Sequence, residues 1–202
     1  MALLNSSHHD ERRQQILDVA TKLFADQGFQ TTTMDHVAAA VGFTKPIIYQ
    51  HFESKDALYS EIVASTALRL MTSLAQATAK ESTARGKVEA AFVVYFTLVV
   101  EESDAFRVLF LQHHTTEQSR HLRNVETSLV SFIEPLLDTN LEADHKRQIA
   151  GAVVGMAEGA AVVWLVRQAN NGWPTVPEGE GARLASRIAT LAWGGLRTIR
   201  AD

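Results

Sequence analysis

The side chains that indicate a specific chemistry most clearly lie together in a short polar segment near the N-terminus. Thr44, Lys45 and Tyr49 can hold backbone phosphates of DNA, in contacts that set register without reading sequence. Gln50 can pair with adenine through two hydrogen bonds, which is worth about 1–3 kcal/mol of discrimination. Ile47 can touch a thymine methyl group. These residue types predict a segment that binds double-stranded DNA.

Two short helices joined by a glycine turn must position this segment. Thr33 is placed to cap a helix that ends at Gly42, where glycine permits the left-handed backbone of a sharp turn. Thr44 is placed to cap the next helix, and Pro46 is tolerated in its first turn because no intrahelical donor is lost there. Ile48 is expected to pack inward. The pattern predicts a helix-turn-helix whose second helix enters the major groove.

The predicted interface extends beyond this helix on both sides, to Thr33 before it and to Lys55 after it. Lys55 follows Ser54, the expected cap of a fourth helix, whose open amides also favour a phosphate. Tyr49 has a second interpretation as a packing residue with a surface hydroxyl, and His51 as a residue that only closes the helix end. The predicted DNA-binding residues are Thr33, Thr44, Lys45, Pro46, Ile47, Tyr49, Gln50, His51 and Lys55.

The order and spacing of these residues closely resemble the TetR family of bacterial transcriptional regulators. The resemblance is dense over about residues 12–62 and is one of length and architecture elsewhere. It is carried by Gly28-Phe29, Thr32-Thr33-Met34, the run from Gly42 to Phe52, and Ser54-Lys55-Asp56-Ala57-Leu58. The resemblance implies an N-terminal three-helix DNA-binding domain and a C-terminal helical domain that binds a small molecule and dimerises.

Composition also favours an all-α protein. Of the 202 residues 46% are hydrophobic, and they recur at three- and four-residue spacings with no clean alternation of period two. The absence of cysteine excludes disulfides and thiol catalysis and fits the reducing cytoplasm. The net charge is -4, and residues 10–60 are slightly acidic. The prediction of DNA binding therefore rests on where the cations stand and not on total charge.

Capping and periodicity place the end of a small N-terminal unit within the fourth helix. With this boundary, the resemblance implies a DNA-binding domain at 10–60 and a ligand-binding and dimerisation domain at 61–202. Residues 1–9 are expected to form a frayed arm, and 10–27 a helix. Pro135 is expected to kink or end a helix. Beyond the helix-turn-helix, the predicted helices cover about 54–80, 87–102, 104–114, 117–138, 142–170 and 180–200.

Two helices of the second domain carry stripes of small residues. Glycines recur every four positions in one, and alanines with a glycine form a thin face on the other. Two such helices from each of two chains can form a four-helix interface with two-fold symmetry. The alternative is that the stripes pack within one chain. The predicted homodimer interface comprises Gly151, Gly155, Gly159, Ala189, Ala192 and Gly195.

Large apolar residues of the second domain predict a pocket for an apolar or amphipathic effector. The alternative for each is that it only fills a core. The predicted pocket residues are Met71, Phe92, Tyr95, Phe96, Phe106, Phe110 and Phe132. The segments Phe106-Arg-Val-Leu-Phe110 and Ala192-Trp-Gly-Gly-Leu196 are also similar to TetR-type regulators of lipid metabolism in actinobacteria, which favours a lipid or acyl ligand.

Glu158 is a single acid within the apolar run 149–166. It either faces the ligand or pairs with an arginine across the interface, and the structural pair is favoured because an unpaired buried carboxylate is costly. The run is too short and too interrupted for a comfortable membrane span, so it is interpreted as a buried interface helix and no membrane partner is expected.

The functional prediction is a ligand-responsive regulator, most simply a repressor that a small effector releases from its operator. An activator, or a regulator controlled by a partner protein, is the alternative. An all-α enzyme is a remote alternative, for which the candidates are His113-His114, His8-His9 and Glu158. Adjacent histidines point to different sides of a helix, and the common catalytic and phosphate-binding motifs are absent from the sequence. No cofactor and no metal are expected.

Overall fold

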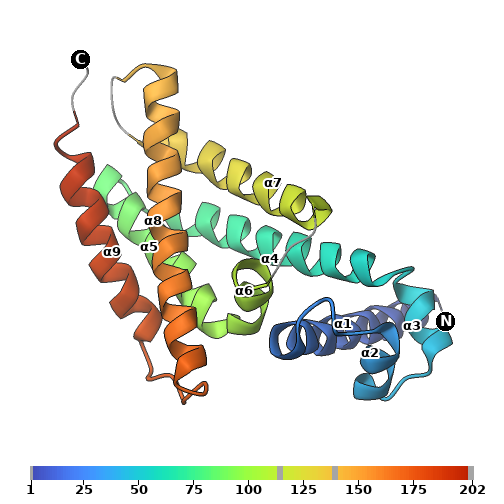
Figure 1. Ribbon diagram of the computed structural model, residues 1–202. Helices are drawn as coiled ribbons and strands as arrows, with labels where there is room; N and C mark the ends of the chain where they lie inside the picture. Colours follow the sequence, from blue (N-terminus) through green and yellow to red (C-terminus); the bar gives the residue numbers. More distant parts are fainter. Residues whose placement is uncertain (1, 113–115, 138–140, 200–202) are drawn as a thin grey trace. The chain divides into compact units, whose positions relative to one another are not determined.

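The protein is built from α-helices joined by short loops (Figure 1). The computed structural model describes residues 2–112, 116–137 and 141–199, and within these ranges it contains helices and no strand. The all-α prediction is confirmed. The elements are α1 Ala2–Gln27, α2 Met34–Val41, α3 Lys45–His51, α4 Lys55–Thr78, α5 Ala84–Glu101, α6 Ser103–Phe110, α7 Thr116–Ile133, the 3-10 turn η1 Glu134–Leu136, α8 Ala143–Asn170 and α9 Glu180–Leu196.

The chain divides into two compact units that do not follow one cut in the sequence. The first unit holds residues 1–66 and 104–121, and the second holds 67–103 and 122–202. The predicted boundary after residue 60 and the observed one after residue 66 both lie within α4. The predicted division did not anticipate that α6 groups with the N-terminal helices. Helix α4 therefore contributes its first half to one unit and its second half to the other.

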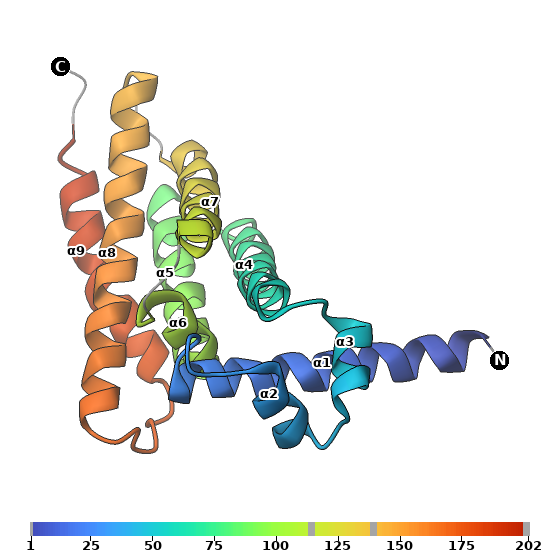
Figure 2. The same ribbon diagram turned by 45° about the vertical axis from the view of Figure 1, so that its right-hand side comes forward.

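In the first unit, α2 and α3 pack beside α1 (Figure 2). The core is formed by residues such as Ile16 and Phe24 of α1 and Ile48 of α3, each with no exposed surface. Gly28 and Gly42 end α1 and α2 with φ angles of 90° and 79°, a conformation that costs glycine little because it has no Cβ. These two glycines allow three helices to fold back on one another within a short stretch.

In the second unit, α5, α8 and α9 run side by side in both views (Figures 1 and 2). Gly181 of α9 approaches α5 so closely that a Cβ there would lie 2.8 Å from the Cα of Thr97. Ala185, Ala189 and Ala192 continue the same buried face of α9. Small side chains along one face thus let α9 lie directly against its neighbours within the chain.

Several helix ends differ from the predictions. Helix α1 begins at Ala2, so the expected N-terminal arm is helical. Helix α5 begins at Ala84, because Thr83 caps it by accepting a hydrogen bond from the Gly86 amide at 3.0 Å. Pro135 does end α7, which passes into the 3-10 turn after Ile133.

Helix α8 is the one described helix that is long and apolar enough to cross a membrane by length and composition. Only 39% of the residues in its most apolar window are buried inside the chain. Length and composition alone are weak grounds for a span, since helices at the core of soluble proteins also satisfy them. Its buried residues, among them Val154 and Trp164, pack within the second unit.

Candidate nucleic-acid interface and ligand cavity

Helix α3 buries one side and leaves a polar ridge on the other. Ile48 is fully buried beneath it, and Phe52, which follows the helix, is 3% exposed. Tyr49 and Gln50 remain exposed, with 45% of the tyrosine surface open to solvent. The exposed positions continue to the helix start with Thr44, Lys45 and Pro46, while Ile47 is half-buried.

The two predicted threonine caps behave differently. The hydroxyl of Thr33 accepts a hydrogen bond from the His36 amide at 3.2 Å, so the predicted cap of α2 is confirmed. Thr44 occupies the cap position of α3, but its side chain makes no cap hydrogen bond, so that part of the prediction was wrong. Pro46 in the first turn leaves fewer amides to satisfy there. The exposed Thr44 hydroxyl therefore does not cap α3 through a hydrogen bond.

Lys45 at the start of α3 is paired with Asp35 in the first turn of α2. Its Nζ lies 2.9 Å from one carboxylate oxygen of Asp35 and donates to the other at 3.1 Å. Both side chains are more than half exposed. The hydrogen bond and the charge of Asp35 raise the pKa of Lys45 above its usual value. The ion pair links the two helices of the helix-turn-helix.

Lys55 does not point outward as a phosphate contact would require. Its Nζ donates to the carbonyl oxygens of Phe29 at 2.7 Å, Thr32 at 2.9 Å and Gln30 at 3.4 Å, and lies 4.2 Å from the centre of the Phe29 ring. An ammonium has three donors, so these carbonyls engage all of them. Lys55 therefore has a structural role within the chain, and its contact with DNA stays a prediction. The neighbouring prediction is confirmed, since the Ser54 hydroxyl caps α4 by accepting from the Ala57 amide at 3.0 Å.

His51 lies at the end of α3 and is half-buried against α1. Its ring centre is 4.3 Å from that of His9. Burial lowers the pKa of His51, and the nearby charges of His9, Arg13 and Arg12 lower it further. This position fits the alternative that His51 closes the helix end.

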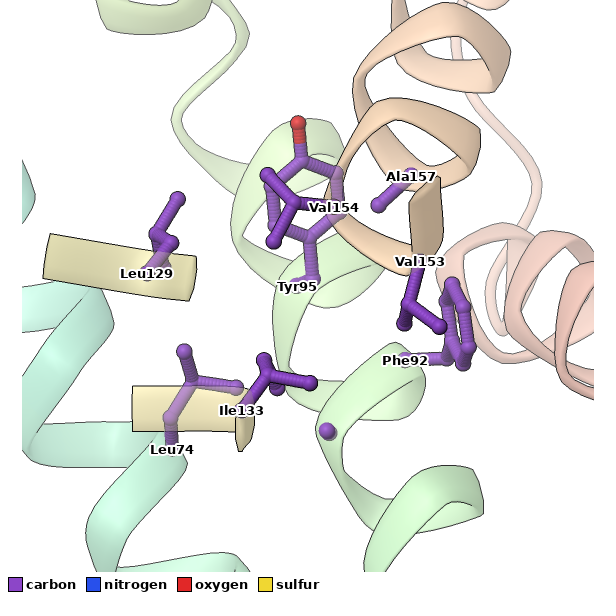
Figure 3. A pocket seen from close by; sticks show the side chains of 9 residues that line it. Leu74, Phe92, Tyr95, Leu129, Ile133, Val153, Val154 and Ala157 are labelled. Atoms are coloured by element: carbon purple, nitrogen blue, oxygen red, sulfur yellow. The ribbon is translucent and has the colours of Figure 1, made fainter. Parts of the chain in front are cut away.

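The second unit contains a small apolar cavity of about 40 Å³ between α4, α5, α7 and α8 (Figure 3). Of the predicted pocket residues, Phe92 and Tyr95 line it, and the Tyr95 hydroxyl is the single oxygen among the labelled side chains in the close-up. The complete lining is Leu74, Ala91, Phe92, Tyr95, Leu129, Ile133, Val153, Val154 and Ala157.

The other predicted pocket residues lie elsewhere. Phe96 is fully buried in the core of the second unit, while Met71 and Phe132 are half-buried and do not line the cavity. Phe106 and Phe110 belong to α6 in the first unit, where their rings pack on each other. The α8 residues of the lining were missed, although alternation of small and branched residues along that helix is a signal for a face that leaves space.

A second hollow of about 20 Å³ adjoins the cavity and shares Ala91, Phe92, Ile133 and Val153 with it. Its remaining lining residues are Lys87, Val88, Leu136 and Leu137. The two hollows share one apolar wall, and Lys87 is the single charged residue among their linings.

Glu158 of α8 is half-buried and follows Ala157, which lines the cavity, but is not itself a lining residue. Burial, and to a smaller extent the charge of Glu126 on α7, raise its pKa to about 7. Its charge acts on Tyr95, whose pKa is raised mainly by burial. Among the described residues of this chain no ion pair joins Glu158 to an arginine, so the favoured structural pair would need an arginine of a second chain.

The residues predicted for the dimer interface fall into two groups. Gly155, Gly159 and Gly195 are exposed and Gly151 is half-buried, and a Cβ added at any of the four would meet nothing within 4 Å. Ala189 and Ala192 are buried within the chain. These two alanines therefore follow the intrachain alternative, because their face of α9 is already covered.

The candidates for an enzymatic site do not form a cluster where the structure describes them. His113 and His114, and the side chain of His8, lie outside the described residues. In the described part of the chain, no group of three or more His, Cys, Asp or Glu could hold a metal ion.

Comparison with known proteins agrees with the geometry of the first unit. The family model described as "Bacterial regulatory proteins, tetR family" matches residues 16–62, which span α1 to α4. The chain is 30% identical over 199 residues to the HTH-type transcriptional activator FasR of Mycolicibacterium smegmatis, covering 96% of this chain and 87% of that protein.

Solved structures extend the similarity to the second unit. A TetR-like transcriptional regulator from Rhodococcus sp. RHA1 is 28% identical with a TM-score of 0.72, covering 93% of this chain and 97% of that one. The fold is also shared with the regulator FadR of Bacillus subtilis, solved in complex with stearoyl-CoA, at a TM-score of 0.73 and 15% identity over 90% of this chain and 98% of that one.

The relatives are regulators and not enzymes, and the match extends over nearly the whole chain. The resemblance seen in the sequence and the predicted class of function are therefore confirmed. The chain belongs to the TetR family of DNA-binding, ligand-responsive bacterial transcriptional regulators.

Proposed function

We propose that the protein is a cytoplasmic homodimeric repressor that reads its operator through α3 and leaves it when an apolar or amphipathic effector occupies the cavity of the second unit. The observation that carries this proposal is the exposed ridge of α3 above the buried Ile48. A packed apolar side holds the helix in place while polar side chains face outward.

The ridge supports a division of labour between phosphate and base contacts. Thr44, Lys45 and Tyr49 supply hydroxyl and ammonium donors for phosphates. Gln50 has an exposed amide that can pair with an adenine edge. Thr33 and Pro46 border the ridge, and Ile47 is partly available for an apolar contact. Lys55 and His51 are left out because their side chains are engaged within the chain.

The exposed glycines of α8 support the dimer. Gly155 and Gly159 leave open space on a helix face, where the helix of a second copy can approach closely. The apolar side chain of Val163 lies one turn beyond Gly159 on the same helix and is 70% exposed. Two-fold pairing would set two copies of α3 about one DNA turn apart, or a multiple of it.

The apolar cavity supports an effector with a hydrocarbon body. All nine lining side chains are aliphatic or aromatic, as expected for a site that takes a hydrocarbon group. The Bacillus subtilis FadR structure holds stearoyl-CoA, which favours an acyl compound for this chain. An effector can release DNA only to the extent that it binds the released form more tightly.

A specific observation supports the alternative that the protein activates transcription. FasR of Mycolicibacterium smegmatis, similar over nearly the whole chain, carries the name of an activator. A reporter gene placed behind the selected operator distinguishes the two, since deletion of a repressor raises expression and deletion of an activator lowers it.

Selection of bound sequences from a random DNA pool, using the full chain, tests the reading helix. Gln50→Ala is expected to weaken binding to the selected operator about ten-fold and to relax the preference at one base pair. Gln76→Ala, an exposed glutamine of α4, serves as the matched control. Equal binding by both variants would exclude Gln50 from the interface.

Ala157→Phe tests the effector site, because the added ring would fill the cavity. Native mass spectrometry with dodecanoate as the probe is expected to detect a complex with the wild-type chain and not with this variant. Ala169→Phe, at an exposed position of the same helix, should bind as the wild type does. Retained binding by Ala157→Phe would place the effector elsewhere.

A further inference from the structure

The ion pair between Lys45 and Asp35 joins the cation of the reading helix to an acid of the helix before it. Lys45 is the only lysine or arginine in α3. Its Nζ contacts both carboxylate oxygens of Asp35, at 2.9 Å and 3.1 Å. Both groups are exposed, as are Thr33 and Thr44. A phosphate that approaches Lys45 therefore meets a carboxylate already in place.

The neighbouring cations of the first unit do not offer a replacement. Arg13 is 3.5 Å from Glu61 and lies over the ring of Phe52. Lys22 pairs with Asp26 at 3.4 Å, and the three donors of Lys55 are used by backbone carbonyls. Arg12 is exposed and lies near His51, at the far end of α3. The ammonium of Lys45 is thus the main cation at the start of the ridge, and its availability sets how strongly that part of the ridge attracts phosphate.

The geometry points to Asp35 as an affinity-setting residue, an intramolecular competitor for Lys45 that a DNA phosphate must displace and that keeps binding to arbitrary DNA weak. This inference rests on the proposed role of α3 as the reading helix. The partner is the phosphate backbone of any duplex, because the competition involves charge and not base identity.

Counterion release shows why the exchange weakens binding. A lysine that neutralises a phosphate ordinarily releases a bound cation from DNA, which drives association at low salt. When Lys45 leaves Asp35, the freed carboxylate attracts a cation in return. The net release is then close to zero, and the carboxylate also repels the phosphate. Removing the acid should restore the full salt-dependent contribution of Lys45.

The chain offers a matched control for this test. Asp35 and Asp56 are both exposed acids in the first turns of helices of the same unit, so each favours its helix dipole to a similar degree. Asp35→Asn and Asp56→Asn each raise the net charge by one. Only the first removes the partner of Lys45.

The experiment measures binding of the full chain to a labelled random-sequence duplex of about 30 base pairs by fluorescence anisotropy, at about 25 to 200 mM NaCl. At low salt Asp35→Asn is expected to bind about three- to ten-fold tighter, with a slope of log K against log salt steeper by about 0.9 per protomer. Asp56→Asn should change affinity by less than about two-fold.

The double variant tests the exchange itself. Lys45→Ala is expected to weaken binding of the otherwise wild-type chain, because it leaves the Asp35 carboxylate unpaired at the ridge, and to remove most of the gain when combined with Asp35→Asn. Equal affinities for Asp35→Asn and Asp56→Asn, or a gain that persists without Lys45, would overturn the inference. If instead Gln50→Ala also leaves operator binding unchanged, the proposed reading helix is what fails.

Discussion

The ammonium of Lys55 lies 2.7 Å from the carbonyl oxygen of Phe29 and 4.2 Å from the centre of the same residue's ring. The contact joins the first turn of α4 to the loop that follows α1. A lysine at a position that suits a phosphate contact thus holds α4 to the loop between α1 and α2.

Lys55→Ala should therefore lower stability. Losing charged hydrogen bonds to buried carbonyls and a cation–π contact is expected to reduce the free energy of unfolding by about 2 kcal/mol. Urea unfolding measures this, with Lys22→Ala as a control whose exposed ion pair should contribute less than about 0.5 kcal/mol. A Lys55→Ala protein of unchanged stability but weaker DNA binding would restore the phosphate-contact interpretation.

Gly155→Leu should prevent dimerisation without unfolding the chain. A side chain at this exposed glycine meets no other atom within one chain, but it would obstruct a helix from a second copy. Since leucine favours helix over glycine, the monomer should be as stable as the wild type or more so. Analytical ultracentrifugation gives the assembly state, and Ala75→Leu on α4 provides the control. A variant that still dimerises would move the interface away from these glycines.

Glu158→Gln should change how stability depends on pH. Burial raises the pKa of Glu158 in the folded chain to about 7 from an ordinary value of 4.5, so the folded state holds a proton that the unfolded state has lost. The stability that comes from this retained proton is fully present below pH 4.5 and is lost as the pH rises to about 7. Glutamine has no such loss.

The difference in unfolding free energy between wild type and Glu158→Gln, measured at pH 5 and pH 8, isolates this group from other titrations. The variant should gain on the wild type at pH 8 relative to pH 5. A constant difference would mean that Glu158 is paired with a cation, as an arginine of a second chain could provide.

Local signals in the sequence were sufficient for the helix-turn-helix. The turn at Gly42 requires a left-handed backbone, which glycine adopts readily. Ile48 packs inward because the apolar residues around it are spaced so that they form one buried side of the helix. These features depend on neighbours a few residues apart. The role of Lys55 could not be read in this way, because its carbonyl partners lie more than twenty residues earlier in the chain.

The ligand cavity was less predictable for a related reason. Aromatic residues mark a core, but which of them border empty space depends on how helices face one another. Phe92 and Tyr95 line the cavity, whereas Phe96, next to Tyr95 in sequence, faces the core. Similarly, small residues on α9 permit close packing with any helix, and in this fold Ala189 is covered from within the chain.

The most direct test of the reading helix combines Gln50→Ala with a change in the DNA. In this test the adenine that the selected operator presents to α3 is replaced by 7-deazaadenine. The replacement removes the N7 acceptor, one of the two groups of adenine to which a glutamine amide can form a hydrogen bond. If Gln50 reads this base, each change alone should weaken binding about ten-fold and the two together little more, because both remove the same contact. Independent, additive losses, or no loss from Gln50→Ala, would contradict the account.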